Sequence, residues 1–247
     1  RDPEMSRGLG DVYKRQVLPS FGQWTYGIFG EDKGTDNQIE VNANDRYTQD
    51  RWKVPHSESD NWKFERIYRI NFFLSEALPK FGEDMSGSQN TISGSVATIK
   101  HYIGEMYFLR AYEYFKKLQL FGDFPIINQP LADEMEALRE ASKRFPRNEV
   151  ARFIISDLDK AYAYMSDVDM ATTRINKDAA MLVKSRVALF EATWLQNFKG
   201  TAFVPGGEGW PGASLHNNYQ YPSGNLDNEV KYFLEQAVEA SKLVADK

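Results

Sequence analysis

The stretch that decides the fold is GEMYFLRAYEYFKKLQLFGDFPII, residues 104–127. Together with the residues just before it, this stretch places apolar or aromatic side chains on nearly every face of a helix, a pattern typical of a helix buried among others. Gly122 stands where a C-cap glycine belongs, and Pro125 follows shortly afterwards. The sequence therefore predicts a buried helix over residues 96–121 that stops at Gly122 and leads into an extended segment.

Further helices are predicted on both sides of this stretch. They cover residues 61–78 with Pro79 as terminator, a segment that starts near Asn148 as N-cap, a segment from behind Asn176 to about residue 196, and a segment from about residue 227 to the end. No convincing alternation of apolar and polar residues remains for strands, so the predicted class is all-α. Helices of this length indicate stacked hairpins of a tetratricopeptide-like kind, although no regular repeat is present and the array is expected to be irregular.

Two long insertions separate the predicted helices, over residues 23–60 and 197–225. Both are rich in Gly, Asn, Asp and aromatic residues. Loops of more than about 15 residues in a compact domain are usually functional or disordered. The many rings argue against simple disorder, so we expect these insertions to carry function.

Composition narrows the range of functions. The net charge is −5 and the pI is about 5.4, so no cationic field exists to attract nucleic acid. Cysteine is absent, and the three histidines occur singly, without the HExxH spacing of a zinc site. No phosphate-binding loop, GxSxG elbow or dinucleotide fingerprint is present. We therefore expect no metal, no cofactor and no nucleic-acid partner.

Residues 1–16, RDPEMSRGLGDVYKRQ, have neither periodicity nor the apolar core of a signal peptide. We interpret them as a non-native leader and exclude them from the fold argument. Residues 17–247 are then expected to form the helical domain.

Four segments, in this order, resemble the SusD/RagB family: WKFERIYRINFFL at 62–74, the stretch quoted above, RNEVARFIISDLDKAYAYM at 147–165, and RINKDAAMLVKSRVALFEATW at 174–194. Each segment alone is weak, because amphipathic helices with an arginine are common. Their shared order is specific. One departure is Thr173, where the family often has glycine, and it affects only the local turn.

The resemblance implies a binding protein rather than an enzyme: a lipoprotein on the outer face of the outer membrane that captures an oligosaccharide or polysaccharide for import. Its implied partner is a SusC-like TonB-dependent transporter, over which it sits as a lid. The lipid anchor would lie outside this sequence, and residues 17–247 would be a partial SusD-like domain that lacks the family's C-terminal part.

Sugar rings present apolar C–H faces and a rim of hydroxyls, so a capture site needs flat aromatic surfaces with polar groups at their edges. In the first insertion, we expect Trp24, Tyr47 and Trp52 to stack on sugars, and Asn44 and Arg46 to bond their hydroxyls. The alternative is that these rings only pin a long loop to the helices.

The second insertion offers Trp210 between glycines, together with Phe203, Tyr219 and Tyr221. Trp210 is the ring most expected to face outward and to bind sugar. The alternative is a compact loop packed by its own aromatic rings.

Charged residues within the family-like helical segments have a different interpretation. We expect them to form structural ion pairs and caps rather than a binding site; they are Arg110, Asp123, Asp157, Arg174 and Arg186. A buried arginine paired with a carboxylate holds helices in register.

Two other functions fit the same fold class. An all-α glycoside hydrolase needs two carboxylates that face each other across a cleft, for which the acids available are Glu31, Asp32, Asp36, Glu83 and Asp84. A helical-repeat scaffold for protein partners would instead have a concave face poor in aromatic residues.

Overall fold

The computed structural model describes residues 61–82, 84–166 and 174–246. The chain divides into two units, residues 1–64 and Glu65–Lys247, and the described helices lie in the second. Its elements are α2 (Glu65–Phe81), α3 (Val96–Phe121), α4 (Met135–Ala141), α5 (Arg147–Tyr164), α6 (Lys177–Asn197), the 3-10 helix η3 (Pro211–Ser214) and α7 (Leu226–Ala245). No strand forms among the described residues, where an isolated bridge pairs Phe124 with Phe145. The all-α prediction is confirmed.

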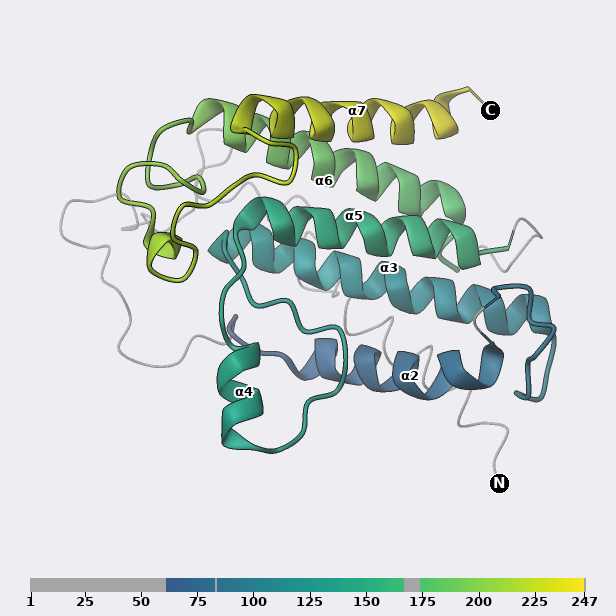
Figure 1. Cartoon of the computed structure of the whole chain (residues 1–247). Helices are drawn as coiled ribbons and strands as arrows, with labels where there is room; N and C mark the ends of the chain where they lie inside the picture. Colours follow the sequence, from purple (N-terminus) through teal and green to yellow (C-terminus); the bar gives the residue numbers. More distant parts are fainter. Residues whose placement is uncertain (1–60, 83, 167–173, 247) are drawn as a thin grey trace, which may run out of the picture. The chain divides into compact units, whose positions relative to one another are not determined.

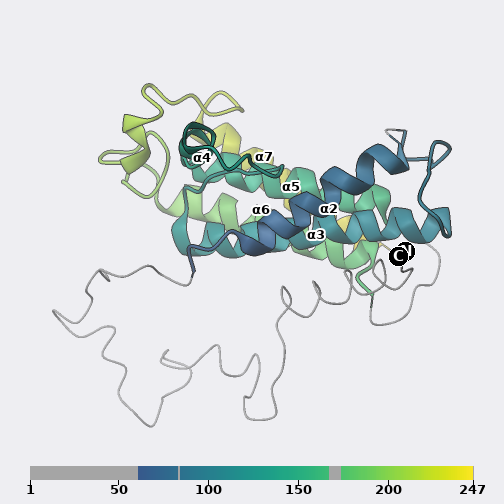
Figure 2. The same ribbon diagram turned by 90° about the horizontal axis from the view of Figure 1, so that it is seen from below.

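The long helices lie side by side in the order α2, α3, α5, α6, α7, each packed on the next (Figure 1). Consecutive long helices run antiparallel, because the α2–α3 connection lies at one end of the stack and the α3–α5 and α6–α7 connections lie at the other. This is the predicted irregular array of helix hairpins. The view at right angles shows α4 and the loop after α6 at the same end of the stack (Figure 2).

The bounds of α3 are those predicted. Ser95 caps its first turn by accepting a hydrogen bond from the N–H of Thr98. Gly122 ends it with a φ of 67°, and the N–H of Gly122 donates to the carbonyl of Leu118 at 2.9 Å. Side chains all around α3 are buried, which fits its place between α2 and α5.

The prediction that Pro79 ends α2 is wrong. The helix includes Pro79 and continues to Phe81, and Gly82 follows with a φ of 102°. A proline removes one N–H donor, but in the last turn this loss does not prevent two more residues from keeping helical geometry. The buried ring of Phe81 anchors the end of α2 in the core.

The N-cap predictions have mixed outcomes. Asn176 caps α6 as predicted, by accepting a hydrogen bond from the N–H of Ala179. Asn225 caps α7 in the same way through the N–H of Asn228, although no cap was predicted for this helix. Asn148, in contrast, lies inside α5, which starts one residue earlier after Pro146. Its side chain is buried and bonds to another part of the chain, as described below.

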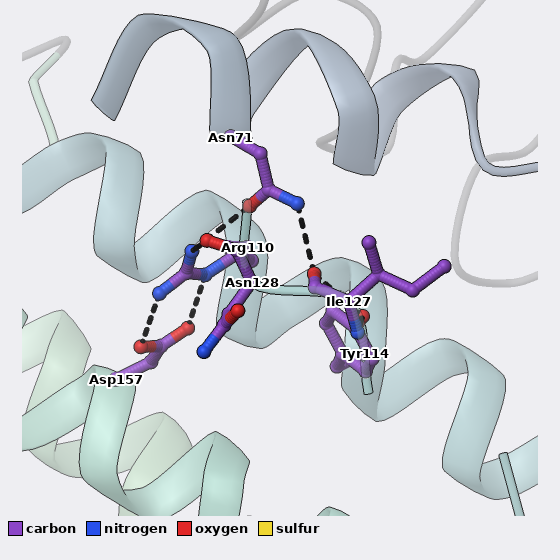
Figure 3. Close-up of polar contacts among 6 residues, drawn as sticks. All are labelled: Asn71, Arg110, Tyr114, Ile127, Asn128 and Asp157. Atoms are coloured by element: carbon purple, nitrogen blue, oxygen red, sulfur yellow. Dashed lines mark hydrogen bonds and ion pairs between the residues drawn. The ribbon is translucent and has the colours of Figure 1, made fainter. Parts of the chain in front are cut away.

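A buried polar network joins three helices to the segment after α3 (Figure 3). Arg110 on α3 donates from Nε and Nη2 to the carboxylate of Asp157 on α5, at 2.6 and 2.8 Å. Its Nη1 donates to the side-chain oxygen of Asn71 on α2 at 2.9 Å and to the carbonyl of Asn128 at 3.1 Å. The predicted structural role of Arg110 and Asp157 is confirmed, and one guanidinium fixes the spacing of α2, α3 and α5.

The other predicted ion-pair residues divide into two groups. Arg174 pairs with the fully buried Glu105 of α3, as expected for a structural residue. Arg186 is exposed on α6 and forms no ion pair within the part of the chain that the structure describes, so its predicted structural pairing is wrong. Its position on the helix turns the side chain away from the neighbouring helices.

Candidate functional site

The loop between α6 and α7, residues 198–225, is held to the helices by buried polar contacts. The indole N–H of Trp210 donates to Oδ2 of Asp123 at 2.7 Å, and the hydroxyl of Tyr219 exchanges hydrogen bonds with the side chain of Asn148 at 2.9 and 3.1 Å. Within the loop itself, the hydroxyl of Tyr221 donates to the carbonyl of Pro205 at 2.6 Å. The loop is therefore fixed at the end of the stack where α3 stops and α5 starts.

Asp123 joins three segments at this point. It follows the C-cap Gly122, and its Oδ1 accepts the backbone N–H of Arg147, the first residue of α5, at 2.8 Å. Burial raises the pKa of the Asp123 carboxyl, against the opposing effect of hydrogen bonds from Trp210 and from the Arg147 backbone. The predicted structural role of Asp123 is confirmed.

A cleft of about 530 Å³ opens beneath this loop. It is called the loop cleft below, and its lining comprises Leu118–Asp123 at the end of α3, Arg144 and Arg147, Trp194, and the loop residues Ala202, Phe203, Trp210, Pro211, Gly212 and Leu215. Its volume lies in the range of small-ligand sites, roughly 300 to 1,000 Å³. Leu120, Phe203 and Leu215 are the most exposed apolar side chains around it, at 58%, 61% and 53%.

The wall of the loop cleft contains aromatic rings and the buried ion pair of Arg147 with Glu191. Arg147 donates from Nε and Nη2 to Glu191 at 3.0 and 2.9 Å, and its guanidinium lies 4.0 Å from the centroid of the Trp194 ring. Burial raises the pKa of Glu191, and the neighbouring Arg147 opposes that rise. Because this pair balances its own charge, the cleft offers aromatic faces edged by Asp123 and the exposed Arg144.

The expectation that Trp210 faces outward is wrong. The residue is 5% exposed, its ring lies against His216 and Tyr219, and its indole N–H is taken up by Asp123. A buried indole needs a partner for its N–H, and Asp123 supplies one on the helix side of the loop. Trp210 still lines the loop cleft, so its role in ligand binding stays a prediction.

The ring that the loop presents to solvent is Phe203. Its backbone carbonyl accepts the indole N–H of Trp194 at 3.0 Å, and its ring meets Phe198 edge-on, with centroids 5.4 Å apart. The sequence favoured Trp210 because glycines stand close to it on both sides, whereas Phe203 in the same loop lies between Ala202 and Val204. The distinguishing signal is the acceptor Asp123, which is 87 residues away from Trp210.

The remaining predicted glycan-binding residues lie outside the described residues: Trp24, Asn44, Arg46, Tyr47 and Trp52. Their assignment stays a prediction.

Asp84 is the one hydrolase candidate among the described residues, since Glu31, Asp32, Asp36 and Glu83 lie outside them. Its carboxylate accepts hydrogen bonds from the hydroxyls of Ser86 and Ser88, and these bonds lower its pKa. A general acid needs a raised pKa, and the serine hydrogen bonds act on Asp84 in the opposite direction. Within the described residues no three acidic or histidine side chains gather as metal ligands do, and no described helix has the length and apolarity to cross a bilayer.

Comparison with known proteins gives a consistent family. The model of the SusD-like family, described as starch-binding and associating with the outer membrane, matches residues 12–189. SusD-like protein P2 of Formosa agariphila is 30% identical over 100 residues, which cover 40% of this chain and 19% of that protein.

Solved SusD-like structures also match. A SusD-like protein of Bacteroides fragilis is 25% identical with a TM-score of 0.43, over 57% of this chain and 25% of that one. A laminarin-binding SusD-like protein is 20% identical with a TM-score of 0.43, over 55% of this chain and 27% of that one. The chain thus covers 19% of the curated relative's length and 25% to 27% of these solved chains.

Proposed function

We propose that this chain, which belongs to the SusD-like family of starch-binding proteins that associate with the outer membrane, binds oligosaccharides at the cell surface and does not cleave them. The observation that carries this proposal is the match of the family model to residues 12–189. The loop cleft lies at one end of the helix stack. It is built by residues from α3, the start of α5, α6 and the loop after α6.

The chemistry of the loop cleft suits a sugar. Phe203 offers an exposed ring face for the apolar C–H side of a pyranose, beside Trp194, whose ring also carries the Arg147 guanidinium. The carboxylate of Asp123 and the guanidinium of Arg144 stand at the edges where hydroxyls lie. The polar anchors of the loop are made within the protein, so the cleft is built before a ligand arrives. A preformed site saves the entropy of ordering a loop on binding.

The finer parts of the proposal are suggested by the family. We place the protein on the outward face of the outer membrane, held by a lipid anchor outside this sequence, and we assign it a SusC-like TonB-dependent transporter as partner. In this arrangement it holds a saccharide over the transporter for import. The first insertion, with Trp24, Tyr47 and Trp52, is proposed to contribute further stacking surfaces.

The proposal is tested by screening the chain on an array of neutral and acidic oligosaccharides, and by incubating every bound glycan with the protein and separating the products by chromatography. Binding without shortened products is expected. Shortened products would establish a hydrolase instead, and absence of binding to every glycan would contradict the capture function. A Trp52→Ala variant of the chain tests the contribution of the first insertion in the same assay.

A further inference from the structure

Two further clefts meet on one face of α5, away from the loop cleft. The α2–α5 cleft has a volume of about 370 Å³ and is lined by Leu74, Ser75, Leu78, Pro79, Tyr107, Arg110, Asn128, Gln129 and Lys160. The α5–α7 cleft has about 360 Å³ and is lined by Met85, Arg152, Ile155, Ser156, Asp159, Lys160, Ala163 and Tyr232. Lys160 lines both, and neither cleft shares a lining residue with the loop cleft.

Three exposed polar side chains around the α2–α5 cleft form no hydrogen bond or ion pair with the part of the chain that the structure describes. Asn128 and Gln129 follow one another in the segment after α3, and Lys160 lies on α5. The backbone carbonyl of Asn128 accepts a bond from Arg110, but among the described residues the side chains of Asn128, Gln129 and Lys160 make no hydrogen bond or ion pair. Two amides and an ammonium therefore stay available to a ligand with hydroxyl and acidic groups.

The apolar part of the same cleft is compatible with a sugar. The Tyr107 ring and the Leu74, Leu78 and Pro79 side chains line it, and Nζ of Lys160 lies 5.4 Å from the centroid of the Tyr107 ring. The lysine thus stands at the border between an apolar surface and solvent. That position suits an acidic substituent on a ring that rests against the apolar wall.

Lys160 acts electrostatically on the carboxyl of Asp157, which Arg110 already pairs, and it forms no ion pair of its own with the described residues. The other charged side chains that line the two clefts each lie within hydrogen-bond distance of an opposite charge, in the pairs Arg110 with Asp157 at 2.6 Å, Arg152 with Glu229 at 2.7 Å, and Asp159 with Lys184 at 2.7 Å. Counted over the described lining residues and their partners, Lys160 is thus the positive charge in excess on the surface that the two clefts form. An anionic ligand there gains an ion pair without displacing an existing one.

We propose that this surface is a second saccharide site, selective for sugars that carry a carboxylate or a sulfate ester, in which Lys160 pairs with the acidic group and Asn128 and Gln129 bond the ring hydroxyls. The inference rests on the proposed glycan-binding function and adds an acidic class of ligand at a separate place. It gives the chain a means to prefer acidic over neutral saccharides although its net charge is −5.

The test uses matched pairs of probes with the complete chain. Calorimetry compares tetragalacturonate with its fully methyl-esterified form, and a sulfated galactan tetrasaccharide with its desulfated form. At least one acidic probe is expected to bind more tightly than its uncharged partner. The probe with the larger preference shows whether the site selects a carboxylate or a sulfate ester. Lys160→Gln should reduce this preference by up to about fivefold, the size of one exposed ion pair, and Lys160→Arg should retain it. Added salt should weaken the acidic probe alone.

Lys242→Gln is the matched control, because Lys242 is an exposed lysine on α7 that lines neither cleft. Asn128→Ala with Gln129→Ala should weaken the acidic probe and its uncharged form alike. Equal affinity for charged and uncharged forms, or a preference unaffected by Lys160→Gln, would overturn the inference and leave the proposed function intact if neutral glycans still bind. Failure of every saccharide on the array would overturn both.

Discussion

Trp210 donates its indole N–H to Asp123 at 2.7 Å, and this bond ties the loop after α6 to the junction of α3 and α5. Because Asp123 also accepts the backbone N–H of Arg147, one carboxylate organises the end of α3, the start of α5 and the loop. The largest ring of the loop thus helps to build the loop cleft, and the exposed Phe203 is the ring that we propose to meet a ligand.

Trp210→Phe should destabilise the protein by about 1 to 3 kcal/mol, because a carboxylate removed from water loses one of its two donors. Denaturant unfolding with a far-UV signal measures this change. Trp194→Phe is the matched control: its indole N–H bonds an exposed carbonyl, and its loss should cost less. Equal costs for the two variants would show that the Asp123 contact does not hold the loop.

Arg110→Met should cost about 3 to 5 kcal/mol in the free energy of unfolding, because it leaves the carboxylate of Asp157 buried without its partner. Burial raises the pKa of Asp157, and the bonds from Arg110 oppose that rise. The double variant Arg110→Met with Asp157→Leu should recover much of the loss. Lys80→Met, which breaks an exposed pair with Glu76, should change stability by less than about 1 kcal/mol. If Arg110→Met and Lys80→Met cost the same, the network in Figure 3 is not what spaces the helices.

Glu229 gives a pH-dependent contribution to stability. Burial opposes its ionisation, but hydrogen bonds from Arg152, Asn148 and Ser223 outweigh burial and hold its pKa below the ordinary value of 4.5. A lowered folded-state pKa means that the stabilisation is present above pH 4.5 and is lost as pH falls through the folded value. The stability difference between the protein and Glu229→Gln should therefore shrink between pH 6 and pH 3 in urea titrations.

Asp227→Asn serves as the control for that titration, since Asp227 pairs with Lys199 at an exposed position. Its stability difference is expected to be small at every pH. A Glu229→Gln difference that stays constant across the acid range would contradict the role given to the Arg152–Glu229 pair.

Much of this fold can be predicted from local patterns in the sequence. The bounds of α3 follow from its continuous apolar pattern and from Gly122, and the start of α6 follows from the capping residue Asn176. The place of α7 follows from its helical periodicity. The seven-residue α4 escaped prediction because it buries no side chain and so has no apolar stripe. One local signal led to a wrong prediction. Asn148 was predicted as an N-cap, but its side chain donates hydrogen bonds to Tyr219 and Glu229, which lie 71 and 81 residues away in the sequence.

The candidate site was less accessible to sequence reasoning for the same physical reason. A tryptophan between glycines turns inward when a buried acceptor can take its indole N–H. For Trp210 that acceptor is Asp123, which follows the end of α3. Sequence proximity cannot show this. The structural use of Arg110 and Asp157, in contrast, was predictable, because a charge on a helix that is apolar all round must be paired.

The assignment of the loop cleft as the glycan site is tested most directly by calorimetry with the glycan that binds best on the array. The matched variants are Phe203→Ala and Phe72→Ala. Both rings are exposed, Phe203 at 61% in the loop cleft and Phe72 at 51% on α2 outside it. We predict that Phe203→Ala weakens binding by about 1 kcal/mol or more, the scale of one ring contact, and that Phe72→Ala leaves affinity unchanged. Unchanged binding in Phe203→Ala, or an equal loss in both variants, would contradict the assignment of the loop cleft as the glycan site.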